Sequence, residues 1–146
     1  MTLSIGVVLG TLLPPRQAEA QQPVTYSSPA VIQFHFIKPS ARADYEAVMS
    51  QLSQALQQSA NTEHDRQAQA RGWKVYRAGA DFSGQGMVPY VHLIDPVISG
   101  ADYGEMNIMN EVFVDEIQEI YENYQAMFTD AQLKILPVEL TLVEDF

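Results

Sequence analysis

Ala30-Val31-Ile32-Gln33-Phe34-His35-Phe36-Ile37 is the stretch of this sequence that decides the fold. Apolar and polar side chains alternate through its centre, with isoleucine and phenylalanine on one side and Gln33 and His35 on the other. Because successive side chains of a strand point to opposite faces, the alternation predicts a half-buried β-strand. Lys38-Pro39-Ser40 ends it, since proline cannot donate a hydrogen bond to a strand ladder.

The residues that follow the strand have the spacing of an amphipathic helix. Between residues 45 and 56 the apolar side chains recur every three or four positions and form one stripe, with glutamines off it. The polar stretch 61–70 either extends this helix or forms a second short one, which Arg71-Gly72 ends.

The second half of the chain predicts a hairpin, a long helix and a last strand. Residues 73–78 and 87–94 indicate two strands joined by a glycine-containing loop, because both are rich in β-branched and aromatic side chains. An apolar stripe then predicts one long helix from about residue 102 to about residue 128. Alternating apolar residues indicate the final strand at 136–143.

This order of elements, β-α-β-β-α-β, predicts the fold class. The economical arrangement is an α+β domain of the ferredoxin-like plan over residues 30–146, with a four-stranded antiparallel sheet and two helices on one face. At 146 residues and 47% hydrophobic composition, the chain is long and apolar enough for one such core.

From residue 30 onward the chain resembles the dimeric α+β barrel proteins, on its element order and on the pattern of residues 31–36 before an amphipathic helix. The resemblance implies a homodimer in which two ferredoxin-like subunits pack sheet against sheet. That superfamily includes cofactor-independent monooxygenases, haem-degrading enzymes and chlorite dismutase relatives, so the likeness chooses no reaction and carries over no catalytic residue.

Composition excludes several kinds of function. Eighteen acidic against eight basic side chains give a net charge of −10, which opposes binding to the phosphates of nucleic acids. The absence of cysteine removes disulfides, thiolate nucleophiles and cysteine-based metal sites. The sequence contains no Gly-x-Ser-x-Gly elbow, so it gives a hydrolase no positive support.

The N-terminus predicts export. Residues 3–13 form an apolar run of the length found in signal peptides, and Ala18-Glu19-Ala20 fits a small-x-small cleavage site. We expect a signal peptide at 1–20, a flexible lead-in at 21–29 and a periplasmic or secreted protein; the alternative is a disordered apolar tail on a cytosolic protein. No segment reaches the ~20 apolar residues that a membrane span needs, so we expect none.

The candidate site follows from the strand alternation. If Ile32, Phe34 and Phe36 face the helices, Gln33 and His35 lie on the opposite, open face of the sheet. The same reasoning places further polar side chains there, namely Tyr90, His92 and Glu139. Since the first strand of a ferredoxin-like sheet is central, His35, His92 and Glu139 are expected to converge.

Two imidazoles and a carboxylate suit acid–base chemistry, or binding of Zn, Fe or Mn. No short metal motif supports the second use, so we assign no metal ligand and expect no cofactor. His35 and His92 are the candidate catalytic bases, and the candidate ligand-binding residues are Gln33, Tyr76, Tyr90 and Glu139. The main alternative is that these polar residues line a contact between the sheets of a dimer.

The leading interpretation is an exported homodimer that binds a small apolar ligand, between sheet and helices or between subunits. A cofactor-independent oxygenase-like or isomerase-like enzyme fits such a pocket, although the sequence leaves catalysis open. The alternative function is a non-catalytic structural or interaction protein that dimerises through its sheet.

Overall fold

The computed structural model describes residues 22–129 and 135–146, so the expected signal peptide at 1–20 lies outside the described residues. The elements in chain order are β1 (Ala30–Ile37), the 3₁₀ turn η1 (Pro39–Ala41), α1 (Arg42–Gln58), α2 (Arg66–Gly72), β2 (Trp73–Arg77), β3 (Val88–Ile94), α3 (Glu105–Asn110), α4 (Ile117–Met127) and β4 (Ile135–Leu140).

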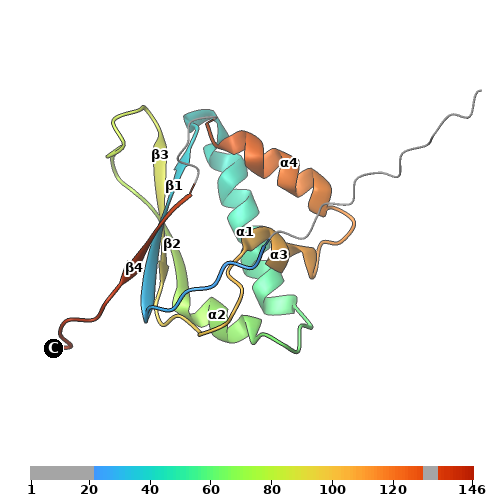
Figure 1. Ribbon diagram of the computed structural model, residues 1–146. Helices are drawn as coiled ribbons and strands as arrows, with labels where there is room; N and C mark the ends of the chain where they lie inside the picture. Colours follow the sequence, from blue (N-terminus) through green and yellow to red (C-terminus); the bar gives the residue numbers. More distant parts are fainter. Residues whose placement is uncertain (1–21, 130–134) are drawn as a thin grey trace, which may run out of the picture.

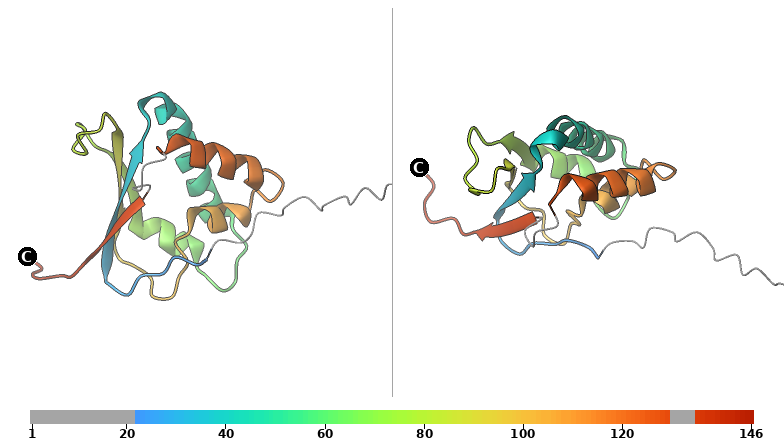
Figure 2. Two further views of the ribbon diagram at one scale, coloured as in Figure 1. Left: turned by 45° about the horizontal axis from the view of Figure 1, so that its top comes forward. Right: turned by 90° about the horizontal axis from the view of Figure 1, so that it is seen from above.

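The strands form one antiparallel sheet in the order β2-β3-β1-β4, and the helices cover one side of it (Figure 1). In this sheet β1 is central, with Gln33 opposite His92 of β3 and opposite Pro137 of β4. The other views show the same two layers, with the opposite face of the sheet free of helices (Figure 2). The predicted α+β domain with a four-stranded antiparallel sheet is therefore confirmed.

The helix α1 has the predicted apolar stripe. Its buried side chains are Tyr45, Val48, Leu52, Ala55 and Leu56, which recur every three or four residues. This stripe packs toward the sheet and toward α3 and α4 (Figure 1). The polar stretch after it forms the separate helix α2, whose N-cap Asp65 accepts a hydrogen bond from the backbone N–H of Ala68.

The prediction of two helices is wrong, because the structure has four α-helices in the described residues. The long helix expected at 102–128 is divided into α3 and α4 by a turn at 111–116. Glu111 lies at this break and is fixed by Arg66 of α2, whose Nη2 is 2.6 Å from Glu111 Oε1. The β-branched residues Val112 and Val114 in the turn favour a helix less than unbranched ones do.

The predicted faces of the sheet are also wrong. Gln33 and His35 of β1 are buried against the helices, whereas Ile32, Phe34 and Phe36 lie on the face without helices. The same reversal holds for β3, in which Tyr90, His92 and Ile94 are buried. Alternation separates two sets of side chains but does not say which set meets the helices. Here polar side chains on the helices give the histidines their partners.

We call the face without helices the open face. The register assigns to it Ala30, Ile32, Phe34 and Phe36 of β1, Lys74 and Tyr76 of β2, Pro89, Val91 and Leu93 of β3, and Leu136, Val138 and Leu140 of β4. Phe82, from the loop between β2 and β3, packs its ring edge-on against Phe34 and Phe36 at centroid distances of 5.6 Å. This face is therefore largely apolar.

Residues 22–29, expected to be a flexible lead-in, make specific contacts with the domain. The backbone N–H of Val24 donates to Asp102 Oδ1, and Tyr103 N–H donates to the Val24 carbonyl. The ring of Tyr26 lies 5.8 Å from that of Tyr103. Among the described residues, no helix is both long enough and apolar enough to cross a membrane.

Candidate functional site

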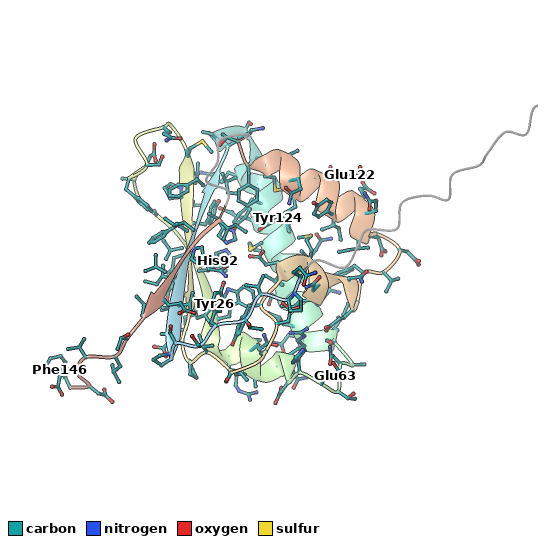
Figure 3. The ribbon with its side chains drawn as sticks, in the orientation of Figure 1. Tyr26, Glu63, His92, Glu122, Tyr124 and Phe146 are labelled. Carbon is teal, nitrogen blue, oxygen red and sulfur yellow. The ribbon has the colours of Figure 1, made fainter. Side chains whose placement is uncertain are left out.

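A cluster of polar side chains lies in the core, between the sheet and the helices. We call it the core polar cluster; its members are His35, Tyr45, Trp73, His92, Glu105 and Tyr124. Figure 3 shows His92 and Tyr124 pointing into this space, whereas Glu63, Glu122 and Phe146 lie at the periphery. All six side chains are more than nine-tenths buried.

The two histidines come from neighbouring strands and stack on each other. His35 in β1 and His92 in β3 have ring centroids 3.9 Å apart and planes inclined by 13°. They lie on the same face because His92 is directly opposite Gln33, two residues from His35 on the same side of β1. Neither side chain is exposed to solvent.

The hydroxyl of Tyr45, from the apolar stripe of α1, joins both rings. Its oxygen lies 2.9 Å from His35 Nδ1 and 2.7 Å from His92 Nε2. Trp73 Nε1, at the start of β2, donates to His92 Nδ1 at 3.1 Å.

The tryptophan determines the direction of the hydrogen bonds, because an indole N–H can only donate. His92 Nδ1 is therefore an acceptor, and the proton of the neutral ring is on Nε2, which donates to Tyr45. The Tyr45 hydroxyl then donates to His35 Nδ1, so that the proton of His35 is on Nε2. This nitrogen lies 3.4 Å from Gln33 Oε1 and 3.5 Å from Glu105 Oε1.

Glu105 is the acidic member of the cluster. Its Oε1 is 3.5 Å from His35 Nε2 and 3.9 Å from His92 Nδ1, and its Oε2 accepts a hydrogen bond from the Tyr124 hydroxyl at 3.2 Å. Within the described residues, Oε1 is buried without a hydrogen-bond partner. A buried carboxylate oxygen in this condition costs stability, which is a common property of functional sites.

Glu105 is held in place by the segment that precedes it. It is the first residue of α3, and Asp102 anchors this end of the helix by accepting from the backbone N–H groups of Gly104 and Val24. Asn107 also donates to Asp102. The N-cap of α3 is Gly104, which makes no side-chain capping hydrogen bond.

Burial controls the protonation states of the cluster. It lowers the pKa of His92 to about 3, and burial together with the adjacent His92 lowers the pKa of His35 well below 6.5. Both rings are therefore neutral at pH 7, in agreement with the hydrogen-bond directions. Burial raises the pKa of Glu105 to about 7, against the opposing hydrogen bond from Tyr124. Near neutral pH, Glu105 is therefore the member that exchanges a proton.

Of the predicted ligand-binding residues, Gln33 is the one whose side-chain oxygen faces a histidine of the cluster. Its Oε1 faces His35 Nε2, and its Nε2 donates to the Tyr26 hydroxyl. Figure 3 places Tyr26 in the lead-in, below His92.

Glu139 and Tyr76 lie away from the cluster, whereas Tyr90 contacts it through its ring. The register puts Glu139 opposite Val31, and its exposed carboxylate accepts from the Ser27 N–H at 3.3 Å. The expected convergence of Glu139 with the two histidines is therefore wrong, and Glu105 occupies that place. Tyr90 packs on Tyr45 with centroids 4.4 Å apart, while Tyr76 is 52% exposed on the open face.

Tyr90 belongs to a second polar group near the surface. Its hydroxyl donates to Glu46 Oε1 at 2.8 Å, and Arg77 pairs with the same carboxylate oxygen. A hollow of about 370 Å³ lies beside this group, between Arg42 and the loop that carries Asp81. The charge of Arg77 is already balanced by Glu46, so this hollow is a weaker candidate than the core polar cluster.

Sequence reasoning missed four members of the cluster, Tyr45, Trp73, Glu105 and Tyr124. The two tyrosines occupy positions of apolar helical stripes, where their hydroxyl groups need partners in the core. That need was the available signal. Glu105 gave no such signal, because it lies among other acidic residues, a pattern typical of a solvent-exposed helix face.

Comparison with known proteins gives no further assignment. No family model matches the chain, and neither a curated protein nor a solved structure matches it significantly.

Proposed function

We propose that the chain works as a homodimer in which the open faces of two sheets pack against each other. The single observation that carries this proposal is the apolar character of the open face. Leu136 and Val138 of β4 are 41% and 40% exposed there, and Phe82 is 55% exposed. An apolar surface of this kind favours association, because burying it removes it from water.

The charge distribution supports a second copy of the chain as the occupant. Two chains with a net charge of −10 each repel each other, and the repulsion is weakest when the surfaces that meet carry few charges of their own. Among the open-face positions of the four described strands, Lys74 carries the only charge. A twofold axis would bring this uncharged surface onto itself, as closed dimers require. Sheets that pack face to face lie about 10 Å apart, a spacing that these side chains can fill.

The arrangement also supports the ferredoxin-like plan and the likeness to dimeric α+β barrels. β1 lies between β3 and β4, as that plan requires of the first strand. The helices cover the face of the sheet opposite to the open face. The separate helix α2 and the division between α3 and α4 are departures from its simplest form.

The mass of the protein in solution tests the dimer. By analytical ultracentrifugation we expect twice the 16.3 kDa of one chain. Phe34→Asp and Val138→Asp each place a charge on the open face and should produce monomers that retain the native circular dichroism. Ser53→Asp, at an exposed position of α1, is the matched control and should remain a dimer. A monomeric wild-type protein would contradict the proposal.

A second candidate function is chemistry on a small molecule at the core polar cluster. The observation that favours it is Glu105, whose unpartnered Oε1 faces both imidazoles. We assign the role of candidate base to Glu105 rather than to His35 or His92, because burial raises the pKa of its carboxyl group to about 7 and such a group can both accept and release a proton. An oxygenase-like or isomerase-like step on a small apolar substrate is compatible with this base.

Trp73 provides the test of ligand binding. It is the only tryptophan in the chain and its indole donates to His92, so a ligand that enters the cluster should change its fluorescence. A panel of small aromatic and aliphatic molecules is screened against wild type and Glu105→Gln. We expect saturable quenching that the variant weakens; fluorescence that no compound changes would count against this function.

Export is the third proposal, supported by the apolar run and the Ala18-Glu19-Ala20 site of the sequence. Expression of the full chain in a bacterial host should yield a periplasmic protein whose intact mass is that of a chain beginning at Gln21. Recovery of the full-length chain from the cytoplasm alone would contradict it.

A further inference from the structure

We propose that His35, His92 and Glu105 bind one divalent first-row transition-metal ion. The ligand atoms are His35 Nε2, His92 Nδ1 and Glu105 Oε1. This inference replaces the expectation of a site without metal or cofactor. It concerns the same cluster as the proposed chemistry, but metal binding is measured without reference to any reaction.

The distances between the ligand atoms are close to those of a metal site. Glu105 Oε1 lies 3.5 Å from His35 Nε2 and 3.9 Å from His92 Nδ1, and each of the three residues offers one ligand atom within 4.8 Å of those of the other two. Two atoms that each bind a tetrahedral ion at about 2.1 Å are about 3.4 Å apart. Side-chain shifts of well under an ångström between Glu105 and each ring would therefore complete these two ligand pairs.

The buried carboxylate of Glu105 lacks a partner for Oε1 among the described residues, and a metal ion would supply one. The side chain is more than nine-tenths buried, and within the part of the chain that the structure describes Oε1 has no hydrogen-bond partner. A charged carboxylate in the core needs a compensating cation, whereas Oε1 faces two neutral imidazoles. A dication between the three ligand atoms supplies that charge and a bonding partner for Oε1.

Tyr45 holds the other nitrogen of each ring, in the way that hydrogen-bond partners orient metal-binding histidines. His35 Nδ1 and His92 Nε2 both contact the Tyr45 hydroxyl oxygen, which has two lone pairs and can accept from both. Tyr45 is thus a positioning residue. Metal binding moves the His35 proton from Nε2 to Nδ1, releases Trp73 from His92 Nδ1, and opens the 13° angle between the stacked rings.

The donor set selects the kind of ion. Two imidazole nitrogens and one carboxylate oxygen suit Zn²⁺, Fe²⁺ or Mn²⁺, whereas Ca²⁺ and Mg²⁺ prefer oxygen ligands alone. Because both imidazoles are closed off from solvent, an ion fits the cluster more easily than a large organic molecule does. Three protein ligands leave a coordination position for water or substrate, as in catalytic metal sites.

The experiment uses the full chain, treated with a chelator and dialysed, with Zn²⁺ and Co²⁺ as probes. We expect one ion per chain, a higher Tm in Zn²⁺, and visible absorption from bound Co²⁺. Long-range ¹H–¹⁵N spectra of the imidazoles should show Zn²⁺ shifting Nε2 of His35 and Nδ1 of His92. His64, the third histidine of the chain, lies outside the cluster and is the internal control.

Variants that preserve the hydrogen bonds to Tyr45 distinguish binding from folding. His35→Asn retains an acceptor near the Nδ1 position but loses Nε2; His92→Gln retains a donor near Nε2 but loses Nδ1. Each of these two variants, and Glu105→Gln as a third, should weaken Zn²⁺ binding by at least about tenfold. Loss of a group that only orients a metal ligand already costs about that much. Glu139→Gln, which removes an exposed carboxylate outside the cluster, should bind as wild type does.

The outcome of the metal-binding experiment does not depend on whether the protein is a dimer. Wild-type protein that binds neither ion, Zn²⁺ shifts confined to His64, or an affinity for Zn²⁺ equal to that of wild type in all three cluster variants would each overturn the proposal. If a variant loses its native circular dichroism, the stoichiometry and the imidazole spectra of the wild type remain decisive. Metal binding by a monomer would support this site while contradicting the proposed sheet-to-sheet dimer.

Discussion

The imidazole rings of His35 and His92 are stacked 3.9 Å apart in the core, where both are neutral and both contact one hydroxyl group. Two cations could not occupy these positions, since burial and mutual repulsion both oppose charge there. The polar centre of the protein is therefore a chain of directed hydrogen bonds rather than an ion pair. Its stability depends on the group that joins the two rings.

Tyr45→Phe should destabilise the protein by about 3 kcal/mol, because it leaves the Nε2–H of His92 without a partner and leaves His35 Nδ1 with only the Tyr124 hydroxyl at 3.5 Å. Each such loss costs about 1–3 kcal/mol. Urea unfolding at pH 7 measures the change. Tyr76→Phe removes a hydroxyl from an exposed ring and should change the free energy of unfolding by less than about 0.5 kcal/mol. Equal losses in the two variants would contradict the bridging role.

Gly72→Ala should destabilise the protein by about 1–3 kcal/mol, the usual cost of overpacking. A Cβ at residue 72 would lie 2.9 Å from the Pro96 carbonyl oxygen and 3.2 Å from that of Asp95, which are backbone atoms. Thermal unfolding by circular dichroism measures the effect. At Gly79 a Cβ would meet no described atom within 4 Å, so Gly79→Ala should leave Tm nearly unchanged.

Glu111→Gln should reduce stability at pH 7 by about 2–3 kcal/mol, because it leaves the buried guanidinium of Arg66 without its counter-charge. Partial burial raises the pKa of Glu111, but hydrogen bonds from Arg66, Ser59 and Asn61 outweigh it and hold the pKa below 4.5. A lowered pKa in the folded state means that this stabilisation is complete above about pH 4.5 and is lost as the pH falls through the folded-state value.

The difference between wild type and Glu111→Gln should therefore shrink as urea titrations are repeated from pH 7 down to pH 3. Glu144→Gln, at an exposed position near the C-terminus, should match wild type throughout this range. A difference that stayed constant with pH would show that the carboxylate charge of Glu111 contributes nothing.

Tyr26→Phe should cost about 1 kcal/mol, because the buried amide of Gln33 loses the hydroxyl group that accepts its hydrogen bond. Amide exchange of residues 22–29 should become faster, which tests whether this contact holds the lead-in to the sheet. Tyr121→Phe is the control on α4. Unchanged stability and exchange in Tyr26→Phe would leave residues 22–29 without a stabilising role.

The sequence by itself determined those local elements that follow from short-range rules. Alternation in residues 30–37, the three-and-four spacing of α1 and the strands of the hairpin each depend on neighbouring residues only. The convergence of His35 and His92 also followed, because antiparallel pairing of β1 with β3 puts Gln33 opposite His92. The order of the elements was sufficient for the four-stranded antiparallel sheet.

Only the tertiary structure decided which face of the sheet meets the helices and which carboxylate joins the histidines. Alternation is symmetric between the two faces, and the free-energy difference between the two packings depends on partners distant in sequence. Tyr45 from α1, Tyr124 from α4 and Glu105 from α3 supply those partners. Their hydrogen bonds allow two imidazoles into the core, which leaves Ile32, Phe34 and Phe36 on the open face.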